Sequence, residues 1–160
     1  MGKSLTRPTR DALACHLATL GFTHFVTLNF GLRADVGPPE VEDEKVSITD
    51  RFLYRPDRRV MRRCDERLEY VATFERFTKG RNPIPFHAHI LLKVPSEREP
   101  LLHKHAHAIF RKLEPVRKAT CDVKVIIDQL DVSYYFAKQF DCGETILANK
   151  PFLASGAEYI

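Results

Sequence analysis

The segment Phe86-His87-Ala88-His89-Ile90-Leu91-Leu92 is the part of the sequence from which the fold is best inferred. Aromatic and branched aliphatic residues dominate it, which predicts a strand over residues 86–94. Alternate side chains of a strand point to the same face, so His87 and His89 project together while Ala88 faces the other way. Two imidazoles about 7 Å apart along a strand can be adjacent ligands of one divalent metal ion. The alternative is a pair of half-exposed histidines without a ligand.

A second strand is predicted immediately before it, over residues 69–77. The connection at 78–85 contains two prolines, a glycine and an asparagine, which favour a turn and therefore an antiparallel hairpin. The hairpin brings Glu75 beside the two histidines, where its carboxylate completes a set of two imidazoles and one carboxylate. Such a set suits Mn²⁺, or Mg²⁺ where a phosphate oxygen joins it. The alternative role for Glu75 is that of a cross-strand partner for an arginine.

The rest of the chain alternates between helical and strand patterns, which predicts an α+β fold: an antiparallel sheet with helices on its faces. Residues 31–49 contain Gly37-Pro38-Pro39 and an acidic run, and are predicted to form a loop. Residues 1–160 form one domain in this interpretation. The further elements that we expect are helices over 9–20, 55–67, 96–113 and 131–140 and strands over 24–30 and 121–127, with Ser96 as the cap of the third helix.

The helix expected over 55–67 is rich in arginine and has Pro56 in its first turn. One turn separates Arg58 from Arg62 and Arg59 from Arg63, so that each pair shares a face. These side chains could contact DNA phosphates, which position a strand without specifying its sequence. The alternative is a charged surface helix whose arginines are balanced by its own acidic residues.

The helix expected over 131–140 contains the segment Ser133-Tyr134-Tyr135-Phe136-Ala137-Lys138. Tyr135 lies three residues before Lys138 and Tyr134 four residues before it, so either phenol can meet the ammonium group. A nearby cation favours the phenolate form, which is the nucleophilic one. The helical phase slightly favours Tyr134 as the residue beside Lys138. The alternative is that both tyrosines are core residues of an amphipathic helix.

Three of these segments, in this order, resemble the motifs of the HUH endonucleases, and within them the rolling-circle replication initiator (Rep) proteins. The first motif is similar to Phe25-Val26-Thr27-Leu28-Asn29-Phe30, the second to the strand with His87 and His89, and the third to Tyr135-Phe136-Ala137-Lys138. The resemblance covers residues 24–140. It departs from the family at Ala88, where a bulky hydrophobic residue is usual, and at the long acidic segment 31–49.

The resemblance implies a ferredoxin/RRM-like sheet of about five strands with the metal site under the tyrosine helix. It implies that Glu75, His87 and His89 hold Mn²⁺ or Mg²⁺, that Tyr135 attacks single-stranded DNA or an origin hairpin, and that Lys138 assists. A host helicase would be a further partner. Two alternatives stay open: a single-tyrosine HUH transposase, against which Lys138 argues because glutamine is typical there, and a non-catalytic DNA-binding protein that controls replication.

Composition sets the remaining limits. The 160 residues carry a formal net charge of +4, which permits nucleic acid as a partner without requiring it. The four cysteines form no CxxC pair and no apolar run approaches the ~20 residues of a membrane span, so a cytoplasmic protein with reduced thiols is expected. A further histidine-rich segment, 103–107, could bind zinc but is interpreted as a solvated helix face.

Overall fold

The computed structural model describes residues 7–33, 40–62, 68–77, 83–139 and 146–148. Its strands are β1 (His24–Arg33), β2 (Glu69–Phe77), β3 (Pro83–Lys93), β4 (Thr120–Val125) and the short β5 (Ile146–Ala148). They pair antiparallel in the order β4-β1-β3-β2-β5, which places the histidine strand β3 at the centre. The predicted α+β class, with an antiparallel sheet and helices on its faces, is therefore confirmed.

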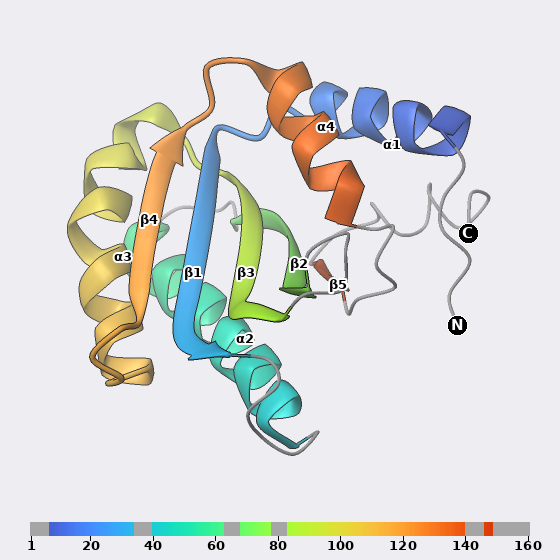
Figure 1. Cartoon of the computed structure of the whole chain (residues 1–160). Coiled ribbons are helices and arrows are strands. Elements are labelled where there is room, and N and C mark those ends of the chain that lie inside the picture. The colour runs from blue at the N-terminus through green and yellow to red at the C-terminus, as the bar shows by residue number, and fades with distance from the viewer. Residues whose placement is uncertain (1–6, 34–39, 63–67, 78–82, 140–145, 149–160) are drawn as a thin grey trace.

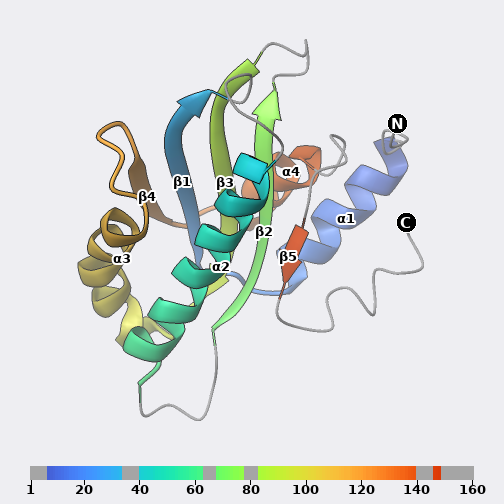
Figure 2. The same cartoon turned by 90° about the horizontal axis from the view of Figure 1, so that it is seen from below.

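Helices cover both faces of this sheet (Figures 1 and 2). Helices α2 (Glu40–Val60) and α3 (Glu99–Leu113) cover one face, and α1 (Arg7–Thr19) and α4 (Gln129–Gln139) lie on the other. A 3₁₀ turn, η1 (Ser96–Arg98), precedes α3. The larger core lies under α2 and α3 and includes Val26, Leu28, Phe74 and Ala88, whereas Leu91 belongs to a smaller core near α1 and α4.

Helix α2 differs most from the sequence-based prediction. We expected a loop through residue 49, but the helix begins at Glu40, and residues 34–39 lie outside the described part of the chain. Ile48, Phe52 and Leu53 are buried, so this segment presents an apolar stripe to the sheet at helical spacing. Acidic residues near its beginning are also favoured by the helix dipole. The acidic run was a helix start that we interpreted as a loop.

The arginine-rich helix is correspondingly the end of α2 and not a helix of its own. Pro56 lies inside α2 and not in its first turn, and the helix ends at Val60. Arg62 follows that end, so the predicted pairing of Arg58 with Arg62 along one helix face is wrong. Arg63 lies outside the described residues.

The other element predictions are confirmed apart from their ends. Helix α1 ends just before Gly21, whose φ of +68° suits glycine at the end of a helix. Ser96 forms no side-chain cap, because η1 occupies its position and α3 begins only at Glu99. The cap that sequence reasoning missed is Asp128, whose Oδ1 accepts hydrogen bonds from the amides of Leu130 and Asp131 at 2.9 and 3.0 Å. This cap fixes where the tyrosine helix α4 begins.

Candidate active site

Strand register brings the predicted metal ligands to one face of the sheet. On β3, His87 pairs with Asn29 of β1 on one side and with Glu75 of β2 on the other. His89 pairs in the same way with Thr27 and Thr73. Residues paired directly across antiparallel strands point to the same face. This is the face of α1 and α4, because the alternate residues pack into the core under α2 and α3.

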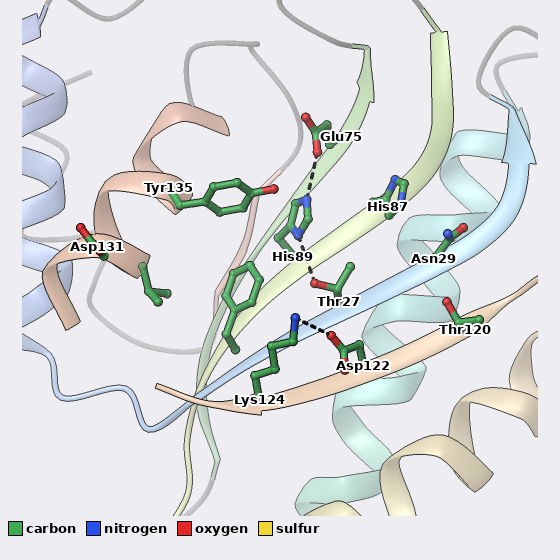
Figure 3. Close-up of a pocket in the computed structure, with 12 residues that line it drawn as sticks. Thr27, Asn29, Glu75, His87, His89, Thr120, Asp122, Lys124, Asp131 and Tyr135 are labelled. Carbon is green, nitrogen blue, oxygen red and sulfur yellow. Dashed lines mark hydrogen bonds and ion pairs between the residues drawn. The ribbon is translucent and has the colours of Figure 1, made fainter. Parts of the chain in front are cut away.

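An open cavity of about 600 Å³ lies on this face, between the sheet and α4 (Figure 3). The lining residues come from four strands and one helix. They are Phe25, Thr27, Asn29, Glu75, His87, His89, Thr120, Asp122, Lys124, Asp131, Val132 and Tyr135. The β2–β3 hairpin and the tyrosine helix α4, which are far apart in the sequence, therefore contribute polar groups to one cavity.

His89 is held on two sides. Its Nε2 lies 3.0 Å from Glu75 Oε2, and its Nδ1 lies 3.4 Å from Thr27 Oγ1. The ring of Phe25 stacks on it with a centroid separation of 5.6 Å. Two ligands of one ion are separated by roughly 3 Å when each bond is about 2.0–2.2 Å long. Glu75 and His89 are thus spaced as two ligands of one metal ion would be.

His87 lies beside this pair, with its ring parallel to that of His89 and their centroids 6.0 Å apart. Burial lowers the pKa of His87 and the His89 ring acts in the same direction, while the Pro85 backbone and Glu75 oppose them. The buried Nδ1 of His87 has no hydrogen-bond partner of standard geometry. The Pro85 backbone therefore influences the pKa from nearby without forming a regular hydrogen bond to Nδ1. A neutral imidazole of this kind is the form that binds metals. Glu75 and His89 are already in contact, but the potential ligand atoms of Glu75, His87 and His89 do not all lie within 4.8 Å of one another, so His87 would have to move toward the other two to share an ion.

Tyr135 projects from α4 over the same residues. Its ring lies edge-on to His89 at 5.6 Å and to Phe25 at 5.9 Å, with 44% of the residue exposed. Burial raises the pKa of Tyr135, and the negative charge of Glu75 raises it further. Tyr134 does not line the cavity. The structure therefore brings Tyr135, and not Tyr134, to the predicted metal ligands.

Lys138 does not line the cavity in the described part of the chain, although it is exposed on the same helix. Asp131, Val132 and Tyr135 form the lining face of α4, and Lys138 lies beyond it toward the end of the helix. The cation that lines the cavity is Lys124 of β4, which forms an exposed ion pair with Asp122 at 3.1 Å. Alternation along the predicted strand 121–127 places Asp122 and Lys124 on one face, and sequence reasoning did not use this signal.

The described arginines predicted to bind DNA, Arg58, Arg59 and Arg62, do not line this cavity. Arg58 and Arg59 are exposed in the last turn of α2, which covers the opposite face of the sheet. Arg58 Nη1 donates a hydrogen bond to the hydroxyl of Tyr54 at 3.1 Å and lies over its ring. Arg62 is also exposed. The structure does not bring these side chains to the candidate active site.

A different group also has metal-binding geometry. Among the described residues, His24, Glu99 and His103 are the group of three whose potential ligand atoms all lie within 4.8 Å of one another. His103 is exposed, in agreement with the predicted solvated helix face. That prediction did not anticipate this cluster. It overlooked Glu99, one turn earlier on α3, and His24, which only the fold brings near.

Comparisons with protein-family models, with curated proteins and with solved structures found no match to this chain. In the part of the chain that the structure describes, no helix is both long and apolar enough to cross a membrane.

Proposed function

We propose that this chain nicks and rejoins single-stranded DNA with Tyr135 as the nucleophile, in the manner of the HUH Rep endonucleases that its motifs resemble. The observation that carries the proposal is the position of Tyr135 over His89 in the cavity shared with Glu75 and His87. The order of the strands, with the two histidines at the centre of the sheet, is also compatible with a ferredoxin/RRM-like HUH fold.

The reaction is an in-line displacement at one phosphodiester. The phenolic oxygen of Tyr135 forms a bond to phosphorus while the bond from phosphorus to the 3′ oxygen breaks. The phenol gives up its proton and the departing 3′ oxygen gains one, which leaves a 3′-hydroxyl and a 5′-phosphotyrosine. The covalent bond conserves the phosphodiester, so the reverse attack by a 3′-hydroxyl rejoins the strand without a nucleotide cofactor.

Glu75, His87 and His89 are the residues that would hold a divalent ion, Mn²⁺ or Mg²⁺. Such an ion supplies Lewis-acid stabilisation of charge on the phosphate oxygens. The contact of Glu75 with His89 orients both side chains toward the cavity, and Thr27 and Phe25 hold the His89 ring in place. Side chains held in this way need little reorganisation when substrate arrives.

The surroundings of Tyr135 keep its hydroxyl protonated before substrate binds. Burial and Glu75 both raise the pKa of Tyr135. A phenol of this kind is a weak nucleophile in the free protein. Cationic groups at the loaded site would lower the cost of the phenolate, which would confine nucleophilic attack to the bound state.

Lys124 is the side chain that we expect to contact the DNA backbone within the cavity, because it supplies the positive charge of the lining. Lys124→Ala should weaken binding of single-stranded DNA and lower the magnitude of the log-affinity against log-salt slope by about 0.7, the value for one lost phosphate contact. Fluorescence anisotropy over a salt series measures both. The matched variant Lys138→Ala should leave the slope unchanged. If the slope changes in Lys138→Ala but not in Lys124→Ala, the phosphate contact is made by Lys138 and not by Lys124.

The arginine cluster gives a separate prediction. Replacing Arg58, Arg59, Arg62 and Arg63 together with alanine should weaken DNA binding to a similar degree for every sequence, with a slope loss of about 0.7 per phosphate contact. Because α2 lies on the opposite face of the sheet, the rate of adduct formation at saturating DNA should stay at the wild-type value. An unchanged slope would make this cluster an ordinary charged surface.

The decisive experiment is a search for the covalent adduct. The protein is incubated with Mn²⁺ and a pool of single-stranded oligonucleotides with a randomised centre, labelled at the 3′ end. On a denaturing gel, the label should appear in a band that migrates with the protein, and proteolysis should remove this shifted band. DNA binding without any adduct would contradict the proposal and favour the binding-only alternative.

A further inference from the structure

A second cluster of metal-binding side chains lies on the other face of the sheet. His24 is the first residue of β1, Glu99 is the first residue of α3, and His103 follows Glu99 by one helical turn. His24 has the same parity on β1 as Val26 and Leu28, which pack under α2 and α3. The cluster is therefore separate from the cavity that contains Tyr135.

The three side chains converge on one point. Glu99 Oε1 lies 3.9 Å from His24 Nε2 and also 3.9 Å from His103 Nε2. The two imidazole rings meet edge-on with a centroid separation of 5.6 Å. Two ligands of a tetrahedral ion are roughly 3.3 Å apart when each bond is about 2.0–2.1 Å long. A contraction of about half an ångström, within the reach of the partly exposed Glu99 and His103, would complete the site.

His24 has an unsatisfied atom directed into this cluster. The residue is only 1% exposed, and its Nε2 is buried without a hydrogen-bond partner. The 3.9 Å to Glu99 is too long for a hydrogen bond. Burying a polar atom without a hydrogen-bond partner costs free energy. Because His24 Nε2 faces Glu99 and His103, an ion bound between the three side chains would remove this cost.

The other ring nitrogen of His24 explains why Nε2 is available as a ligand. Nδ1 lies 2.8 Å from Thr23 Oγ1, which also accepts a hydrogen bond from the Val94 amide. The single hydroxyl proton of Thr23 has the carbonyls of Leu92 and Val94 as acceptors, each at 3.3 Å. With the hydroxyl proton directed to one of these carbonyls, Nδ1–H donates to Oγ1 and the lone pair is on Nε2. Histidines that bind metals are oriented in this way by a hydrogen bond from the second ring nitrogen.

We propose that His24, Glu99 and His103 bind one Zn²⁺ ion. Two imidazoles and one carboxylate are a typical three-residue zinc set, in which water occupies the fourth position. Nitrogen ligands favour Zn²⁺ over Mg²⁺ or Ca²⁺, which prefer oxygen. The ion satisfies the buried Nε2 and joins the beginning of α3 to the beginning of β1.

Zinc binding is best measured in a protein whose other candidate metal site is disabled. The full-length variant Glu75→Gln/His87→Ala keeps His89 and its packing but leaves that site with one histidine. Calorimetric titration with Zn²⁺ alone should give one tight site in this background. Adding His103→Ala should weaken the affinity by more than the roughly 100-fold that loss of an outer hydrogen bond can cost. The matched control His107→Ala, on an exposed position of the same helix, should leave the affinity unchanged.

Thermal unfolding supplies an independent readout, because a ligand that binds only the folded state raises the midpoint. Zn²⁺ should raise it in the background protein and in the His107→Ala control but not after His103→Ala. His103 is partly exposed, so its replacement should not prevent folding. No zinc binding by the background protein, or equal affinity in the His103→Ala and His107→Ala proteins, would overturn the proposal. Neither outcome depends on the proposed nicking activity.

Discussion

Replacing Tyr135 with phenylalanine is expected to abolish the protein–DNA adduct completely, because the substitution removes the attacking oxygen and nothing else. The phenylalanine ring keeps the edge-on contacts with His89 and Phe25. Tyr135 is 44% exposed, so the change in unfolding free energy should stay within about 0.5 kcal/mol, as for most surface substitutions. DNA affinity should persist, since phosphate contacts elsewhere supply most of it. A denaturing gel with 3′-labelled single-stranded DNA measures the adduct.

Tyr134→Phe is the matched control. It removes the same atom from the next residue of α4, which does not line the cavity, so adduct formation should continue at the wild-type rate. The opposite result, an adduct with Tyr135→Phe and none with Tyr134→Phe, would show that Tyr134 attacks. Loss of the adduct only in the double variant would show that either phenol can reach the phosphate.

The difference between the two tyrosines shows what helical phase alone can predict. Helical phase slightly favoured Tyr134, because the comparison considered only which tyrosine lies on the same helix face as Lys138. The face of α4 that meets the sheet contains Val132 and Tyr135, and Phe136 is buried beside them. Motif spacing selected Tyr135, the tyrosine that lines the cavity, whereas the position of Lys138 relative to the cavity depends on where α4 begins and ends over the sheet.

The shared sheet face of the candidate metal ligands could be predicted because strand geometry is local. Alternation along β3 fixes His87 and His89 to one face, and a hairpin register of a few residues places Glu75 beside them. Ala88 is explained by the same register. It is fully buried between Leu28 and Phe74 of the neighbouring strands, whose larger side chains fill the core around it.

Features that depend on contacts between distant segments were missed. Lys124 belongs to β4, and only the pairing of β4 with β1 brings it to the cavity. His24 meets Glu99 and His103 because α3 packs against the sheet near the start of β1. The start of α2 was missed because an acidic run after Pro38-Pro39 has a loop-like composition, while burial of Phe52 and Leu53 stabilises it as helix.

His87→Ala should give the second large effect, a loss of nicking on the order of 10³-fold, because metal stabilisation of a phosphoryl transition state contributes several kcal/mol. His87 tests this more cleanly than His89, which contacts Glu75 and Thr27 and stacks on Phe25. The Nδ1 of His87 makes no standard hydrogen bond, so its removal should disturb the fold little. Single-turnover adduct formation measured over a series of Mn²⁺ concentrations gives the rate and its metal dependence.

The metal dependence separates a ligand from a residue that only shapes the cavity. A lost ligand should raise the Mn²⁺ concentration needed for half-maximal rate, while DNA affinity measured without metal stays near the wild-type value. His107→Ala, on the opposite side of the sheet, should change neither quantity. If His87→Ala nicks DNA at the wild-type rate with the same Mn²⁺ dependence, His87 is not a ligand. A site with only Glu75 and His89 would then remain, which is too few protein ligands for the proposed two-histidine, one-carboxylate set.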